Sequence, residues 1–334
     1  MACAWENKQR CVEVCANDIG VFAVAHGGTP YITTYDRAGT TFTDLSGIAA
    51  LPSTGFSVAF SPDGSLMSVG HDTSPYITVY ERSEGTFTAL TGVPAVSGIG
   101  WSIVFSPDGT FMAVAHSTSP YLTIYERSGT TFTAVPGVDP PTALTYGLGV
   151  AFSPDGTLLA VGHNTAPNLT IYERSGTTFT KLTGISTPSN TVYGVAFSPD
   201  GTFLATAHHG APYLTIYERS GTSFIAITGV DALPSIGRSI AFSPDGTFLA
   251  VGHQNAPFLT VYLHDAGAFN VVPGIDPPTG LGRSVVFSPD ATLLAVGHDS
   301  SPYLTVYEYS GAVFTKLTEI TAPPGAGYGV AFSP

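Results

Sequence analysis

Short apolar segments alternate with polar turns along the whole chain, and the alternation returns every 45 residues, with one interval of 47. Residues 149–192 form one such unit. Residues 149–152 and 158–163 are apolar, residues 168–172 and 177–182 alternate apolar with polar side chains, and polar turns separate the four segments. Segments this short, rich in β-branched and aromatic residues, are typical of β-strands. The pattern therefore predicts four antiparallel strands in each unit.

Two features recur in every unit. The first segment ends in a Phe-Ser-Pro anchor, whose phenylalanine is Phe60, Phe105, Phe152, Phe197, Phe242, Phe287 or Phe332. The second segment ends in a histidine, which is His26, His71, His116, His163, His208, His253 or His298. A repeat of this length indicates units that stack to bury their apolar faces. Four short strands per unit predict an all-β protein, a seven-bladed β-propeller of four-stranded antiparallel blades. An open β-solenoid is the alternative.

The two ends of the chain predict how the ring closes. Residues 18–46 supply the last three strands of a first blade, and a lone first strand stands at the C-terminus, at about 327–332. Pairing of these two segments would close a single propeller domain, residues 18–334, and leave residues 1–17 as an extension. The competing arrangement places residues 11–15 innermost in blade 1. Cys3, Cys11 and Cys15 all lie in the extension, so the repeats need no disulfide, and whether these cysteines pair stays open.

Composition and charge exclude several classes of partner. The chain is 43% hydrophobic and only 10% charged, so Thr, Ser and Gly must cover much of the surface. Its 24 acids and 11 bases give a net charge of −13, which disfavours nucleic acid. No apolar run reaches the roughly 20 residues of a membrane span, and the first ten residues lack the pattern of a secretory signal. The localisation is left undetermined, with a virion or cytoplasmic assembly favoured, and no cofactor motif is present.

Within the repeat, the segment 152–162 reads Phe-Ser-Pro-Asp-Gly-Thr-Leu-Leu-Ala-Val-Gly, and Leu-Thr-Ile-Tyr-Glu follows after a turn. This combination resembles the WD40 repeat, whose third strand ends in Trp-Asp where this chain has Tyr172-Glu173. The Gly-His pair of that family is missing and its tryptophan is replaced in every unit, so the family's buried hydrogen-bond tetrad is not carried over. The near-identical units are also similar to WD40-like arrays of bacteriophage and environmental bacterial proteins. The resemblance implies a propeller fold and no particular function.

Residues copied in every unit are interpreted as structural. Each repeat histidine ends a strand just before a turn, where its imidazole can bond turn backbone within its own blade. A ring of metal or proton sites is the alternative, but apart from one turn aspartate no carboxylate or cysteine is copied nearby. The innermost strands carry no acid, base or nucleophile beyond Ser57, Ser102, Ser239 and Ser284, and no serine has an activating partner in the local sequence. The sequence therefore predicts no metal site and no enzymatic activity.

Positions that vary between units are the candidates for binding. Four residues before each anchor phenylalanine the chain carries Phe56, Trp101, Leu148, Tyr193, Arg238, Arg283 and Tyr328. Innermost strands line the channel of a propeller, so these side chains should ring one channel mouth. Large aromatics beside two arginines are typical of binding hot spots; the alternative is that they only plug the mouth.

These features predict a non-catalytic scaffold that binds a macromolecule through the variable loops and the channel mouth. The favoured setting is a virion-associated or surface-adhesion protein whose partner is a protein or a glycan. A multivalent lectin with one sugar site per blade is the alternative, and an architectural subunit of a larger assembly is a third hypothesis. A further pattern concerns Arg37, Arg82, Arg127, Arg174 and Arg219, which His264 and Tyr309 replace in the last two units. We expect these arginines to pair with nearby turn carboxylates.

Overall fold

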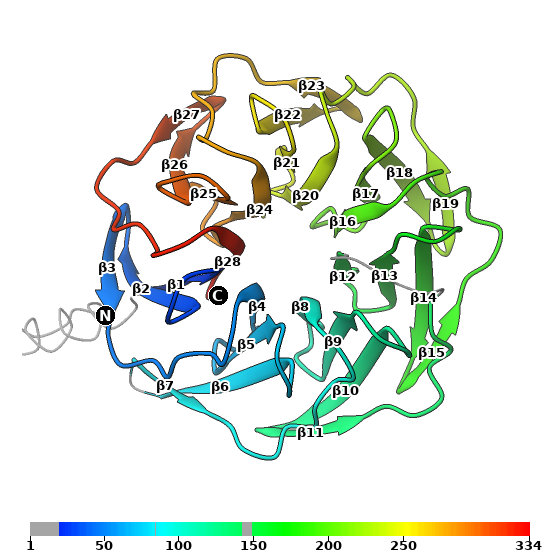
Figure 1. Ribbon diagram of the computed structural model, residues 1–334. Coiled ribbons are helices and arrows are strands. Elements are labelled where there is room, and N and C mark those ends of the chain that lie inside the picture. The colour runs from blue at the N-terminus through cyan, green and yellow to red at the C-terminus, as the bar shows by residue number, and fades with distance from the viewer. Residues whose placement is uncertain (1–19, 84, 142–148) are drawn as a thin grey trace, which may run out of the picture.

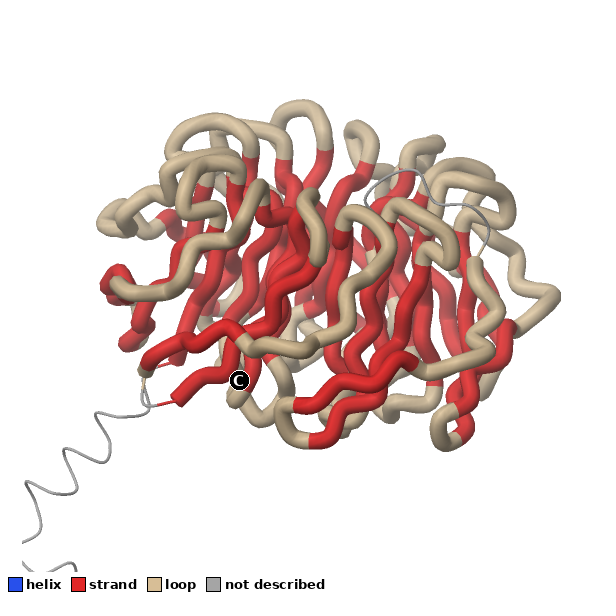
Figure 2. Tube along the Cα trace, turned by 60° about the horizontal axis from the view of Figure 1, so that its bottom comes forward, coloured by secondary structure: helices blue, strands red, loops and turns tan. Residues whose placement is uncertain are grey.

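The computed structural model describes residues 20–83, 85–141 and 149–334, and in this part of the chain every regular element is a β-strand. Twenty-eight strands form seven four-stranded antiparallel sheets that stand like blades around a central channel (Figure 1). The strands run between the two faces of the ring, and the loops gather at these faces (Figure 2). The predicted all-β, seven-bladed propeller is confirmed. No helix in the described residues is long and apolar enough to cross a membrane.

Within each blade the strands follow one another from the channel outward. Blade 1 contains β28 (Gly327–Phe332), β1 (Gly20–His26), β2 (Ile32–Ala38) and β3 (Thr41–Leu45). Blade 2 contains β4 (Gly55–Phe60), β5 (Leu66–His71), β6 (Ile77–Ser83) and β7 (Thr86–Ala89). Blade 3 contains β8 (Gly100–Phe105), β9 (Phe111–His116), β10 (Leu122–Ser128) and β11 (Thr131–Ala134). Blade 4 contains β12 (Val150–Phe152), β13 (Leu158–Gly162), β14 (Leu169–Ser175) and β15 (Thr178–Lys181).

The last three blades keep the same order. Blade 5 contains β16 (Val192–Phe197), β17 (Phe203–His208), β18 (Leu214–Ser220) and β19 (Ser223–Ala226). Blade 6 contains β20 (Gly237–Phe242), β21 (Phe248–His253), β22 (Leu259–Asp265) and β23 (Ala268–Val271). Blade 7 contains β24 (Gly282–Phe287), β25 (Leu293–His298), β26 (Leu304–Ser310) and β27 (Val313–Lys316).

The hydrophobic core lies between neighbouring blades. The second strand of a blade is buried on both faces because a blade packs against each of them, and this is why its sequence is apolar without alternation. Each core cluster joins two blades, as where Phe111 of blade 3 meets Phe179 of blade 4 with ring centroids 5.4 Å apart. The copied third-strand tyrosine is also buried. Its hydroxyl donates to a loop carbonyl, as from Tyr80 to Ala49 over 2.9 Å, so it fastens the incoming loop to the blade.

The ring closes by the predicted pairing of the C-terminal strand with blade 1. β28 pairs antiparallel with β1, with Phe332 opposite Phe22 and Val330 opposite Val24. Beyond the strand, the Ser333 backbone N–H donates to the carbonyl of Val21, and its Oγ accepts from the Val21 N–H, both over 2.7 Å. The innermost position of blade 1 is therefore held by the C-terminal strand, as expected. Residues 11–15, the three cysteines and the 1–17 extension lie outside the described residues.

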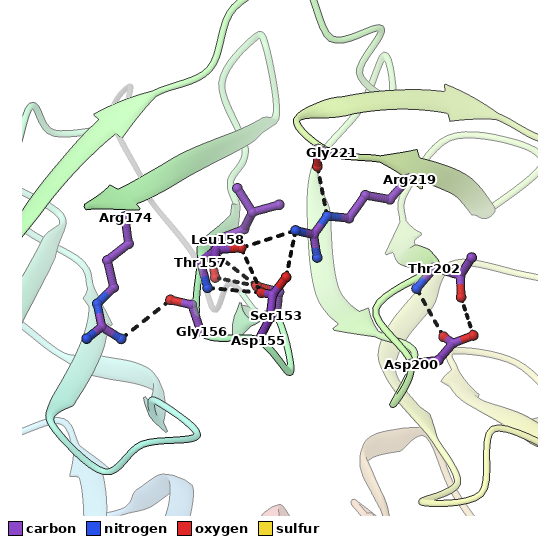
Figure 3. Close-up of polar contacts among 10 residues, drawn as sticks. All are labelled: Ser153, Asp155, Gly156, Thr157, Leu158, Arg174, Asp200, Thr202, Arg219 and Gly221. Carbon is purple, nitrogen blue, oxygen red and sulfur yellow. Dashed lines mark hydrogen bonds and ion pairs between the residues drawn. The ribbon is translucent and has the colours of Figure 1, made fainter. Parts of the chain in front are cut away.

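The turn between the first two strands of a blade is clamped by the next blade. In the turn after β12, the Ser153 Oγ accepts from the Leu158 N–H over 2.9 Å, and Asp155 accepts from the Thr157 N–H over 3.0 Å. Arg219 of blade 5 reaches back to Asp155 over 2.9 Å (Figure 3). Equivalent pairs join Arg37 to Asp290, Arg127 to Asp63 and Arg174 to Asp108. The expected pairing is confirmed for these four arginines, and it joins adjacent blades.

Replacing Arg219 with Gln is expected to lower the free energy of unfolding by less than about 1 kcal/mol, because Asp155 is half-exposed and water screens the pair. R174Q should cost about 0.5–1 kcal/mol more, because the Arg174 guanidinium also lies 4.4 Å from the centroid of the Phe111 ring. In the next blade Leu158 stands in the place of Phe111. Urea unfolding of both variants measures the difference, and equal costs would contradict the ring contribution.

Candidate functional site

A cavity of about 520 Å³ opens at one mouth of the channel, and the varying positions of the innermost strands line it. Each varying residue that the structure describes is the extra residue of a β-bulge, as at Phe56, where the register between β4 and β5 shifts between Gly55 and Ser57. A bulge re-aims the side chain of its extra residue. The residues so placed are Phe56, Trp101, Tyr193, Arg238, Arg283 and Tyr328, which we call the mouth residues. Leu148, the predicted seventh member, lies outside the described residues.

The mouth residues divide into an aromatic and a cationic part. The Phe56 ring contacts Trp101 and Tyr328, with centroids 4.7 and 5.3 Å apart, and these three residues form an aromatic arc over blades 1 to 3. Arg238 and Arg283 form an arginine pair on blades 6 and 7. Arg238 lies 4.3 Å from the Tyr193 ring centroid, and Arg283 lies 4.9 Å from that of Tyr328. The cavity therefore offers an aromatic wall of tilted rings beside two guanidinium groups.

Three buried donor atoms at the mouth have no hydrogen-bond partner among the described residues. They are the Nε1 atom of Trp101 and the Nε atoms of Arg238 and Arg283. Buried donors are almost always satisfied in folded proteins, and exceptions concentrate where a ligand or water completes them. The mouth residues thus hold three donor atoms whose hydrogen bonds are not made within the described residues.

A second ring of varying residues stands directly behind the mouth, and the sequence prediction missed it. It consists of the residue after each repeat histidine, namely Gly27, Asp72, Ser117, Asn164, His209, Gln254 and Asp299, which we call the rim residues. The Gln254 backbone N–H donates to Ile236, two positions before Arg238, and the His209 N–H donates likewise to Thr191, two positions before Tyr193. The rim residue of a blade is therefore held next to its mouth residue.

In blades 6 and 7 the rim side chain contacts the mouth residue of its own blade. The Gln254 Oε1 accepts from the Arg238 Nη2 over 2.7 Å, and Asp299 Oδ2 lies 3.6 Å from the Arg283 Nη2. In blade 1 a Cβ placed on Gly27 would lie 3.2 Å from the Tyr328 ring. The rim carries acids, amides and one exposed imidazole, His209. The sequence signal that could have found these residues was their variation beside an invariant histidine.

The repeat histidines lie behind the mouth in the body of each blade. All are buried, and each Nε2 lies 2.9–3.0 Å from a threonine Oγ1 on the third strand, as between His163 and Thr170. The His163 Nδ1 donates to the Thr165 carbonyl over 2.7 Å, so Nδ1 carries a hydrogen. Burial lowers the pKa of His163 to about 4. The described residues contain no group of three or more His, Cys, Asp or Glu side chains that could hold a metal ion.

The serines of the innermost strands fasten one blade to the next. The Ser57 Oγ accepts from the Ile103 N–H of blade 3 over 3.1 Å, and Ser102 and Ser284 accept from Val150 and Val330 in the same way. The Ser239 Oγ is buried with no hydrogen-bond partner among the described residues. None of the four contacts an imidazole in the hydrogen bonds of the described residues, so none has the partner that activates a serine nucleophile.

The comparison with protein families matches two of the blades. A family described as "Lactonase, 7-bladed beta-propeller" matches residues 186–272, which contain blades 5 and 6. This stretch supplies Tyr193, His209, Arg238 and Gln254 to the mouth and rim. Among curated proteins, no relative matches this sequence.

Solved structures share the fold at low sequence identity. A Bacteroides uniformis protein named as a 6-phosphogluconolactonase has a TM-score of 0.78 and 17% identity, over 94% of this chain and 99% of its own. A periplasmic gluconolactonase of Pseudomonas aeruginosa has a TM-score of 0.73 and 18% identity, over 95% and 99%. A chain of a mitotic checkpoint complex has a TM-score of 0.67 and 18% identity, over 87% and 88%. These likenesses establish the propeller architecture, and the WD40 resemblance is compatible with it.

The expectation of a non-catalytic scaffold is wrong, and so are its virion, adhesion and lectin variants. The lactonase family match in blades 5 and 6 and the similar structures named as lactonases point to an enzyme. The physical reason for the error lies in the topology. Acids and bases were sought on the innermost strands, whereas the antiparallel pairing brings the end of the second strand beside the start of the first. Asp72, His209 and Asp299 therefore stand at the mouth without belonging to an innermost strand.

Proposed function

We propose that the protein is a lactonase, which opens a cyclic ester by adding water at the channel mouth. The proposal rests on the arginine pair, Arg238 and Arg283, whose buried Nε donors have no partner in the described residues. The blades of this pair also supply the amide of Gln254 and the acid of Asp299 to the rim. The family match supports it, because blades 5 and 6 hold Arg238 and His209. Two of the similar structures carry names of enzymes that act on gluconolactones.

Arg238 is suited to stabilise the oxyanion of the reaction. In lactone hydrolysis water adds to the carbonyl carbon, the carbonyl oxygen becomes an oxyanion, and the ring C–O bond then breaks. The alkoxide takes up a proton, and the product is a hydroxy acid. A fixed guanidinium in a half-buried site stabilises such charge more strongly than water does. Its partner Gln254 is neutral, so the positive charge of Arg238 stays available to the oxyanion.

His209 is placed to take the proton from the attacking water. It is the rim residue of blade 5, next to the mouth residue Tyr193, and Arg238 stacks on that same Tyr193 ring. Tyr193 therefore links the two blades, because its ring contacts Arg238 and the segment before it bonds to the His209 backbone. The His209 side chain is exposed, so the imidazole can exchange its proton with solvent. A positioned imidazole is the commonest general base in proteins.

Replacing Arg238 with Gln is expected to lower kcat/KM for D-glucono-1,5-lactone by about 10²–10³, because one oxyanion donor is lost. The rate is followed in a pH-stat between pH 6.5 and 9, with spontaneous opening subtracted. H209Q should lower the rate by about 10², because the group that takes the proton from the attacking water is lost. R127Q, which alters a clamp at the opposite face, is the matched control and should retain the wild-type rate.

Two outcomes would overturn the proposal. One is a wild-type protein that opens no gluconolactone, aryl lactone or aliphatic lactone faster than buffer. The other is an R238Q variant as active as the wild type. A rate lowered by about 10² in D72N, with a normal rate in H209Q, would transfer the role of base to Asp72, whose Oδ1 is buried with no hydrogen-bond partner in the described residues.

A further inference from the structure

The two arginines of the pair differ in charge compensation. Arg283 faces a carboxylate, because Asp299 Oδ2 lies 3.6 Å from its Nη2. The other oxygen of Asp299 accepts from the Leu281 N–H over 3.1 Å, which fixes the carboxylate beside Arg283. Arg238 faces the neutral amide of Gln254 over 2.7 Å. Asp299 therefore balances the positive charge of Arg283, whereas no acid of its own blade balances the charge of Arg238.

The opposite side of the mouth has no cation. The mouth residues of blades 1 to 3 are the aromatic arc, and their rim residues are Gly27, Asp72 and Ser117, all of them described. An anionic substituent that reached this side would meet the Asp72 carboxylate and no positive charge. Phe56 instead contacts both Trp101 and Tyr328, at interplanar angles of 57° and 53°, so this side offers aromatic ring faces against which the ring of a ligand can pack.

We propose that the substrate is an uncharged lactone whose ring lies on the aromatic arc, and that Asp299 excludes phosphorylated lactones. This inference rests on the proposed function, in which the positive charge of Arg238 binds the oxyanion during hydrolysis. Arg238 is then not free to bind a phosphate group. A phosphate dianion would then find Arg283 already neutralised and would be repelled by Asp299 and Asp72. Asp299 and Gln254 are thus specificity-determining residues, which set the charge that the mouth accepts.

Binding can be measured without turnover. D-Glucono-1,5-lactam and its 6-phosphate carry the ring but lack the ester that would be cleaved. The chain has two tryptophans, so in a W5F background Trp101, on the aromatic arc, reports binding by its fluorescence. We expect the neutral lactam to bind at least tenfold more tightly than its 6-phosphate. W101A, followed by competition calorimetry, should weaken the neutral lactam at least tenfold.

Two isosteric variants test the charge assignment. D299N keeps the oxygen that accepts from Leu281 and should tighten the 6-phosphate at least fivefold, while the neutral lactam stays within twofold. Q254E adds a charge beside Arg238 and should weaken the 6-phosphate further. A wild-type protein that binds the 6-phosphate as tightly as the neutral lactam, or that binds neither, would overturn the inference. So would a D299N variant with unchanged preference.

Parallel turnover assays separate this inference from the proposed function. If the neutral lactam is preferred and D299N shifts the preference, but neither gluconolactone nor its 6-phosphate is opened, the lactonase proposal fails and the charge selectivity stands. If both lactones are opened and the phosphorylated one is the better substrate, the selectivity fails and the lactonase proposal stands.

Discussion

Lowering the pH from 7 to 5 is expected to unfold the propeller, because the buried repeat histidines must stay neutral in the folded state. All seven are 0–3% exposed. Burial lowers the pKa of five of them from 6.5 to about 4, at His26, His116, His163, His208 and His253. Burial also lowers the pKa of His71 and His298. In the unfolded chain each imidazole takes up its proton near its ordinary pKa.

The direction of the effect follows from the proton balance. Between pH 6.5 and 4 the unfolded chain binds more protons than the folded protein, so the free energy of unfolding falls as the pH falls. For the five histidines with a pKa of about 4, the loss between pH 7 and pH 5 is on the order of 9 kcal/mol. This is comparable to the whole stability of an ordinary domain, about 5–15 kcal/mol. We therefore expect the repeat histidine to set the lowest pH at which the propeller stays folded.

Urea unfolding at pH 7.5, 6.5, 5.5 and 5.0, followed by far-UV circular dichroism, measures the slope of stability against pH. H163Q should reduce that slope by about one proton, because one titrating site is removed. T133A, at an exposed position of the outer strand β11, is the control and should leave the slope unchanged. An unfolding midpoint that stays constant from pH 7.5 to 5.0 would refute the prediction.

The turn aspartates act in a separate pH window. Partial burial alone would raise the pKa of Asp290, but hydrogen bonds from Arg37, Ser288 and Thr292 outweigh it and lower the pKa to about 2. Similar contacts hold the pKa of Asp63, Asp108 and Asp155 well below the ordinary range. Such groups lose their contribution only as the pH falls below about 4. Unfolding that begins near pH 6 is therefore assigned to the histidines.

The repeat made most of the fold predictable, because one blade could be read and copied. The strand ends at Phe60, His71 and Phe332 lie where the anchor and the histidine indicated. Counting of strands was enough to predict that β28 closes blade 1, since a lone first strand at the C-terminus needs a partner. The mouth residues were also visible, because packing does not dictate a position that varies among otherwise identical units.

Contacts between units were much harder to read. A single repeat does not reveal that Arg127 pairs with Asp63 of the preceding blade, since that partner follows from the way neighbouring blades pack. The rim was missed for a related reason. His71 lies opposite Gly55 in the hairpin, so Asp72 reaches the mouth although it follows a different strand from Phe56. Pairing across the hairpin brings the rim and mouth residues together, and the sequence of a single strand does not show this.

Deleting residues 327–334 is expected to abolish the folded monomer, because blade 1 would lose its innermost strand and the ring would open. β28 contributes three buried side chains, Val330, Ala331 and Phe332. The Phe332 ring lies 4.6 Å from that of Phe22, and F332A alone should cost about 3–5 kcal/mol. The deletion also strips the backbone partners of β1 and exposes a long apolar edge, which favours aggregation.

Size-exclusion chromatography and thermal unfolding of the truncated chain measure this effect. Removal of Pro334 alone is the matched control. Its side chain is exposed, and it follows Ser333, whose hydrogen bonds to Val21 would be kept. A synthetic peptide of residues 325–334 added in trans should restore the cooperative transition, with a midpoint that rises with peptide concentration by mass action. A truncated protein that stays monomeric with an unchanged melting temperature would show that blade 1 does not depend on β28. Closure would then have to come from another segment of the chain, and the pairing of β1 with β28 would add little to stability.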